Sequence, residues 1–211
     1  AIDGTGTIQP SGTATTRWLI IPSPGAGGTA ASGVRYTVQA RMSMLTSGVP
    51  RVITTFPVAI TVKPQPLLTL EYALPFEIFG DEPLTTVHES TVPFPLGLRV
   101  TNVGAGTAKK FKVTSNQPLI TDNAQGLAVD FNLIGTWLGA DAQAENTLLL
   151  AFGDVAPGTS KQAAWSMTST LSGRFVNFTS TFTHAAELGG ALTSLIQSVT
   201  TYTLIKDVIV D

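Results

Sequence analysis

The chain has 211 residues, of which 43% are hydrophobic and only 12% are charged, about half the usual charged share. A net charge of −2 leaves no basic surface for a nucleic acid and no polybasic patch for anionic lipid. The absence of cysteine excludes disulfides and thiolate metal sites. The longest apolar run lies within Thr147–Phe152 and is too short to span a bilayer, so we expect no membrane insertion.

Apolar and polar residues alternate along several segments of the chain, which is the pattern of half-buried β-strands. In chain order the segments are 94–101, 109–115, 126–135, 162–167 and 176–184. Clusters of Gly, Pro and Asn separate them, as between strands joined by hairpins. Only His184–Ser198 has a pattern that suits a short helical turn. The sequence therefore predicts an all-β fold, with two sheets that each have one buried and one solvated face.

The end of the chain repeats its beginning at a nearly constant spacing. Trp165 follows Trp18 by 147 residues, and both lie at apolar positions of their segments, which predicts that both are core residues. Three pairs of segments match in the same order: Gly6–Ile20 with Gly153–Met167, Ser32–Met44 with Ser172–His184, and Thr55–Lys63 with Thr203–Asp211.

The repeat predicts a division into modules. Residues 67–211 form one complete module, and residues 1–63 correspond only to the last three or four strands of another, with the linker Pro64–Pro66 between them. The counterparts of Leu67–Leu150 are missing from residues 1–63, so we expect the chain to be a segment of a longer array. The apolar face of the half-module needs cover, either from an upstream half or from a neighbouring or identical chain in a head-to-tail filament.

Two stretches, 96–116 and 152–167, carry a resemblance to a known family. The first stretch contains a strand, a TNVGAGTA turn and a second strand, and the second contains PGTS before a strand with Trp165. Together they resemble the immunoglobulin-like, CARDB-type adhesion modules of bacterial surface proteins. The resemblance covers Pro93–Thr170. It implies tandem immunoglobulin-like β-sandwich modules, the first incomplete, in an extracellular, non-catalytic, multi-module protein, and it carries over no catalytic residue.

An acidic cluster follows the first strand of the complete module. Asp81 and Glu82 suit a calcium site, because hard cations need several oxygens that converge from loops. The alternative is a solvated loop in which Asp81 starts an Asx turn. We expect no other cofactor.

Other positions are candidates for ligands or turns. Trp137, expected in a loop, is a possible stacking platform for a sugar, and Asn177 begins a glycosylation sequon on an outward-facing strand position. Gly104–Lys110 lacks the ending of a phosphate-binding loop and is interpreted as a hairpin turn, with Asn102 and Gly104 at positive φ.

No nucleophile, base and stabiliser can be assembled from this sequence, so we expect that the protein is not an enzyme. The leading interpretation is a structural or adhesive module of an extracellular repeat protein or cell-surface filament. The alternative is a carbohydrate- or ligand-binding accessory module of a larger surface enzyme.

Overall fold

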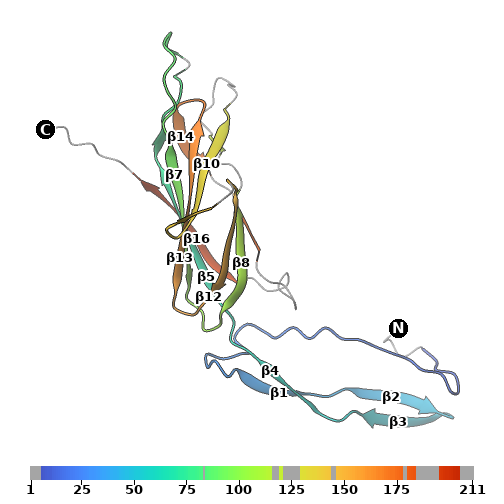
Figure 1. The fold of residues 1–211 in the computed structure, drawn as a ribbon. Coiled ribbons are helices and arrows are strands. Elements are labelled where there is room, and N and C mark those ends of the chain that lie inside the picture. Colours follow the sequence, from blue (N-terminus) through green and yellow to red (C-terminus); the bar gives the residue numbers. More distant parts are fainter. Residues whose placement is uncertain are drawn as a thin grey trace. The chain divides into compact units, whose positions relative to one another are not determined.

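Strands are the regular elements of the described residues in the computed structural model (Figure 1). The structure describes residues 6–82, 84–115, 119–120, 129–143, 146–177, 180–183 and 195–204. The chain divides into unit 1, Ala1–Pro64, and unit 2, Gln65–Asp211, and each is considered by itself. The boundary falls inside the segment that the sequence predicts as a linker. The predicted all-β class is confirmed.

Unit 1 contains two separate antiparallel ladders (Figure 1). The strand β1 (Val34–Val38) pairs with β4 (Val58–Val62), and β2 (Arg41–Thr46) pairs with β3 (Val49–Thr54). Ser47 and Gly48 join β2 to β3 with φ angles of 52° and 78°, which is the backbone conformation of a two-residue hairpin turn. Each strand of unit 1 has one hydrogen-bonded neighbour among the described residues.

Unit 2 holds a six-stranded sheet in the order β11-β10-β13-β7-β5-β16, and two three-stranded sheets in the orders β12-β8-β15 and β6-β14-β9. Its strands are β5 (Leu68–Pro75), β6 (Glu77–Ile78), β7 (Phe94–Asn102), β8 (Ala108–Ser115), β9 (Leu119–Ile120), β10 (Phe131–Leu138), β11 (Asp141–Ala142), β12 (Leu149–Val155), β13 (Ser160–Ser169), β14 (Gly173–Asn177), β15 (Ser180–Thr183) and β16 (Ile196–Leu204). The named pairings are antiparallel, except that β16 runs parallel to β5.

The core of unit 2 comes from alternate residues of strands in two sheets. In β7 and β13 every second side chain is buried, as the alternation of 94–101 and 162–167 predicts. Phe111 of β8 and Phe152 of β12 contribute from the other sheet, and their rings lie 5.9 Å apart. The two sheets thus share one hydrophobic cluster, as in a β-sandwich.

The segment between β7 and β8 is not the predicted hairpin turn, because these strands belong to different sheets. Neither Asn102 nor Gly104 has a positive φ angle. The side chain of Asn102 is fully buried and makes four hydrogen bonds instead. Its amide nitrogen donates to the carbonyls of Gly106 and Val155 at 2.7 and 2.9 Å, and its oxygen accepts from the backbone amides of Leu67 and Gly104 at 3.2 and 3.0 Å. Asn102 therefore fixes the crossing between the sheets.

Trp165 is the largest fully buried side chain of unit 2, and its indole Nε1 donates to the carbonyl of Thr147 at 3.1 Å. We expect Trp165→Ala to lower the free energy of unfolding of unit 2 by about 3–5 kcal/mol, because it leaves a large cavity and removes one of the two hydrogen bonds to the Thr147 carbonyl, the other coming from the Thr136 hydroxyl. Chemical denaturation followed by circular dichroism measures this change. Trp18→Ala, in unit 1, is the control and should change it by less than about 0.5 kcal/mol. Equal small effects of both substitutions would contradict the assignment.

Candidate functional site

The matching segments Gly6–Ile20 and Gly153–Met167 contain the same turn. Gln9–Gly12 and Ala156–Thr159 are each closed by a hydrogen bond from the amide of the fourth residue to the carbonyl of the first, at 2.8 and 3.2 Å. Proline is the second residue of both turns. The third residue has a positive φ angle in both, 62° at Ser11 and 69° at Gly158, as in a type II turn. The local sequence is sufficient to form this turn.

After the turn the two copies differ. Residues 160–169 form β13, which is hydrogen-bonded to β7 on one side and to β10 on the other. Residues 13–22, the counterpart in unit 1, form no strand. Both neighbours of β13 belong to residues 67–150, which we call the first half of unit 2, and the rest of unit 2 is its second half. In the predicted repeat the first half has no counterpart in residues 1–63. Backbone amides and carbonyls form a strand only where another strand pairs with them, so residues 13–21 lack the partner they need.

The next matching element forms strands in both copies but with different neighbours. β1 and β2 align with β14 and β15 and have similar boundaries. In unit 2, β14 pairs with β6 and β9, and β15 pairs with β8. In unit 1, β1 pairs with β4 and β2 with β3 instead. Unit 1 therefore consists of short two-stranded ladders, which are marginal in water by themselves.

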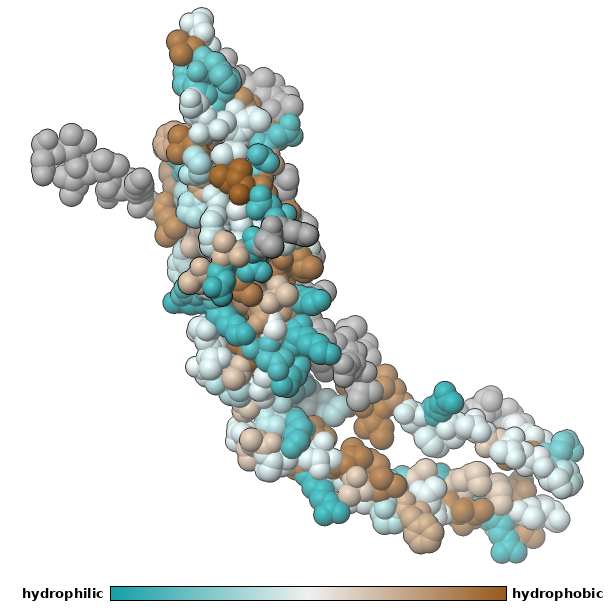
Figure 2. Space-filling model, in the orientation of Figure 1, coloured by the Kyte–Doolittle hydropathy of each residue, from teal (hydrophilic) through white to brown (hydrophobic). Residues whose placement is uncertain are grey.

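The β1–β4 ladder carries an apolar face that solvent reaches. Its opposed pairs on this face are Val34 with Val62, Tyr36 with Ile60, and Val38 with Val58. Val34, Tyr36 and Val58 are 38%, 41% and 58% exposed. Figure 2 shows hydrophobic residues, in brown, at the surface of unit 1. An exposed apolar surface of this kind indicates an interaction site.

Trp18 is a second exposed apolar feature of unit 1. The side chain is 60% exposed, and Leu19 and Ile20 beside it are 65% and 56% exposed. The expectation that Trp18 is a core residue is therefore not met in this chain, whereas Trp165 is fully buried. The physical reason is that no second sheet covers residues 13–21 in the part of the chain that the structure describes. We use the name open face of unit 1 for these two exposed parts taken together, residues 13–21 and the apolar side of the β1–β4 ladder.

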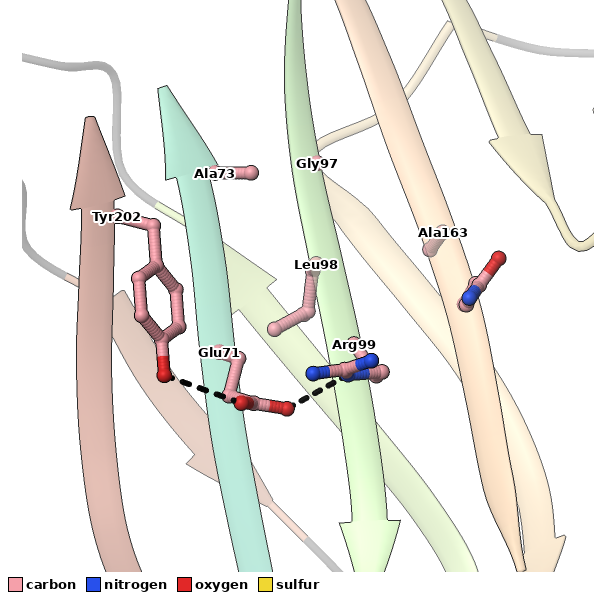
Figure 3. Close-up of a pocket in the computed structure, with 8 residues that line it drawn as sticks. Glu71, Ala73, Gly97, Leu98, Arg99, Ala163 and Tyr202 are labelled. Atoms are coloured by element: carbon pink, nitrogen blue, oxygen red, sulfur yellow. Dashed lines mark hydrogen bonds and ion pairs between the residues drawn. The ribbon is translucent and has the colours of Figure 1, made fainter. Parts of the chain in front are cut away.

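A second candidate site is a hollow of about 260 Å³ on the outer face of the six-stranded sheet. Its lining includes Ala73 of β5 and Gly97 of β7, neighbouring residues whose small size leaves the space open. Figure 3 shows Tyr202 of β16 and Arg99 of β7 on either side of Glu71 of β5. Sequence reasoning missed this cluster, because its members come from strands far apart in the sequence.

The polar groups in the hollow are paired with one another. Arg99 Nε donates to Glu71 Oε2 at 2.6 Å, and the Tyr202 hydroxyl donates to Glu71 Oε1 at 3.3 Å. The hydrogen bond and charge of Arg99 lower the pKa of Glu71, with a smaller contribution from Tyr202, while partial desolvation opposes them. The same hydrogen bond and charge raise the pKa of Arg99. With Tyr202 50% exposed beside this pair, the hollow combines an aromatic ring with charged hydrogen-bonding groups.

The acidic loop is held together by its own hydrogen bonds. Asp81 Oδ1 accepts from the backbone amide of Glu89 at 3.0 Å, and His88 Nδ1 lies 3.1 Å from Asp81 Oδ2. The Glu89 carboxylate accepts from the Glu82 amide and the Thr85 hydroxyl, both at 2.9 Å. The amide of Glu89, followed by His88, lowers the pKa of Asp81. Within the described ranges no group of three or more metal-binding side chains is found, so calcium at Asp81 and Glu82 stays a prediction.

Trp137 lies in a strand and not in the predicted loop. It is the penultimate residue of β10 and pairs with Ala164 of β13 and Ala142 of β11. Its side chain is half-buried, and its ring lies over Gly135, where an added Cβ would meet the ring at 2.3 Å. Gly135 is thus required for this packing. Because the indole packs on Gly135, less of its surface is free for a ligand than in an exposed loop.

Asn177 is the last residue of β14, and its backbone pairs with Leu119 of β9. Its side chain lies outside the described part of the structure, so glycosylation at this position stays a prediction. No helix among the described residues is long and apolar enough to cross a membrane.

No family model, no curated protein and no solved structure matches this chain.

The Glu71–Arg99 pair gives the hollow a defined pH response. Because the folded-state pKa of Glu71 lies below its unfolded value, the pair stabilises unit 2 fully above the unfolded pKa. This contribution is lost as the pH falls through the folded pKa. We expect Arg99→Gln to raise the pKa of Glu71 back toward its ordinary value. Tyr202→Phe should raise the pKa of Glu71 by a smaller amount than Arg99→Gln does. Titration of the Glu71 carboxyl carbon by NMR measures both shifts, and a larger shift in Tyr202→Phe would contradict the assignment.

Proposed function

We propose that this chain is a non-catalytic structural or adhesive segment of an extracellular repeat protein or cell-surface filament, built from tandem immunoglobulin-like sandwich modules. The observation that carries the proposal is the identical turn at Gln9–Gly12 and Ala156–Thr159, followed by a paired strand in one copy only. In this proposal the second copy of the repeated unit is complete, and the first copy has only the strands of a second half. A segment cut from a longer array of such units has this composition.

The chemistry of the surface is consistent with this role. Few charges and a polar surface rich in Thr, Ser and Gly suit a secreted β-protein. The open face of unit 1 supplies a contact between modules, because an apolar sheet face in water favours a covering partner. In this proposal the partners are neighbouring modules or identical chains.

A second candidate function, a carbohydrate- or ligand-binding accessory module, is favoured by the hollow at Glu71, Arg99 and Tyr202. An exposed ring beside paired polar groups resembles the usual composition of a small-molecule site, in which aromatic surface provides contact and polar groups provide orientation.

Surface labelling tests the leading proposal. We expect an antibody raised against unit 2 to label intact cells of the native source, and to decorate regularly spaced positions along extracted material in negative-stain electron microscopy. The control is an antibody against a known internal protein, which should label only permeabilised cells. Labelling of unit 2 only after permeabilisation would contradict an extracellular role.

Glycan-array binding tests the second candidate. If the hollow binds a sugar, Tyr202→Ala should abolish the array signal, because stacking on the ring is lost. Trp137→Ala is the matched control and should retain the signal, since Trp137 lies outside the hollow. The absence of any signal with the unsubstituted protein, or its survival in Tyr202→Ala, would contradict this candidate.

A further inference from the structure

The strands of unit 2 show which partners second-half strands require. Each strand after β12 pairs with a strand of the first half, Leu67–Leu150. The pairs are β13 with β7, β14 with β6, β15 with β8, and β16 with β5. Unit 1 contains the counterparts of second-half strands and of no first-half strand.

The partner that unit 1 requires has a definite chemistry. In unit 2, Trp165 lies opposite Leu96, and β7 buries alternate apolar residues from Phe94 to Val100. The exposed Trp18, which aligns with Trp165, needs an equivalent apolar strand beside it. Residues 13–21 also need backbone donors and acceptors in a strand ladder. The required partner is therefore a set of strands with the pattern of Leu67–Leu150, and an apolar small molecule or a membrane would not satisfy the backbone.

The first half of unit 2 cannot fill this role, because its strands other than the two-residue β11 are already paired with strands among β13 to β16. The same holds for a second copy of this chain, whose first half is paired within its own unit 2. In unit 2 the first half directly precedes the second half in the sequence. We propose that the open face of unit 1 docks onto a further first half-module, patterned like Leu67–Leu150 and located on the N-terminal side of residue 6 in the same polypeptide. This inference rests on the proposed repeat array and names the partner of unit 1.

The experiment adds a copy of a first half to the chain. Residues 65–152 are placed before Gly6, so that Phe152 of the added copy is followed by Gly6, which aligns with Gly153. The spacing of the repeat is thereby kept. The control chain has the same length but carries Leu96→Lys and Leu98→Lys in the added copy, at two positions that are buried in β7 of unit 2.

Hydrogen exchange measured by mass spectrometry reports the docking. In the 211-residue chain we expect the amides of residues 13–21 to exchange quickly, because they form no strand. In the extended chain we expect the same amides to slow by about 100-fold or more, since ladder amides exchange only through opening of the structure. In the lysine control they should exchange as in the original chain. In all three chains the amides of β13 should stay protected, which shows that unit 2 is folded.

The register supplies a second, independent readout, because the chain has no cysteine. Gln162 pairs with Arg99 in unit 2, and Thr15 aligns with Gln162. Thr15→Cys together with Arg99→Cys in the added copy should therefore form a disulfide under mild oxidation. Thr13→Cys together with Arg99→Cys in the added copy is shifted by two residues and should form no disulfide. Side chains two positions out of register are too far apart for that bond.

Two results would overturn the proposal. Fast exchange of residues 13–21 in the extended chain, with β13 protected and no disulfide at the matched pair, means that unit 1 does not accept a first half. Protection of residues 13–21 in the 211-residue chain itself, with elution as a dimer, means that a second copy covers the open face. Neither result depends on where the protein is located. The surface-labelling experiment, which tests the proposed extracellular role, can therefore fail or succeed independently of this test.

Discussion

A β-strand depends on a second strand that pairs with its backbone, and the structure of both units follows from where such partners are present. In unit 2 the strands after Gly153 pair with strands before Leu150, and the resulting sheets share one hydrophobic cluster. In unit 1 the same kind of sequence makes the same turn at Gln9–Gly12 and then no strand. The turn is determined within four residues, whereas the strand is determined by residues elsewhere.

Much of the fold could be predicted from the sequence, because its signals are local. Alternation in 94–101 and 162–167 predicts which side chains of β7 and β13 are buried, and Trp165 is among them. The period of two follows from the backbone geometry of a strand, so it can be read without knowledge of the neighbours. The all-β class rests on the same signal.

The features that could not be predicted depend on distant pairing. Trp18 has the pattern of a core residue, but burial requires a covering sheet that a local pattern cannot reveal. The loop after Asn102 crosses between sheets although its composition is that of a hairpin turn. The hollow depends on the parallel pairing of β16 with β5, which brings Tyr202 beside Glu71, 131 positions away in the sequence. No spacing rule in the sequence indicates that contact.

The parallel pairing of β5 with β16 has a mechanical consequence. Leu68, at the start of β5, lies beside Ile196, and Leu204, at the end of β16, lies beside Pro75. Tension applied before β5 and after β16 therefore pulls the two strands along their length in opposite directions. The inter-strand hydrogen bonds are then loaded together in shear, whereas an antiparallel pair pulled at one shared end opens one bond at a time. A module closed in this way resists extension along a tensed polypeptide.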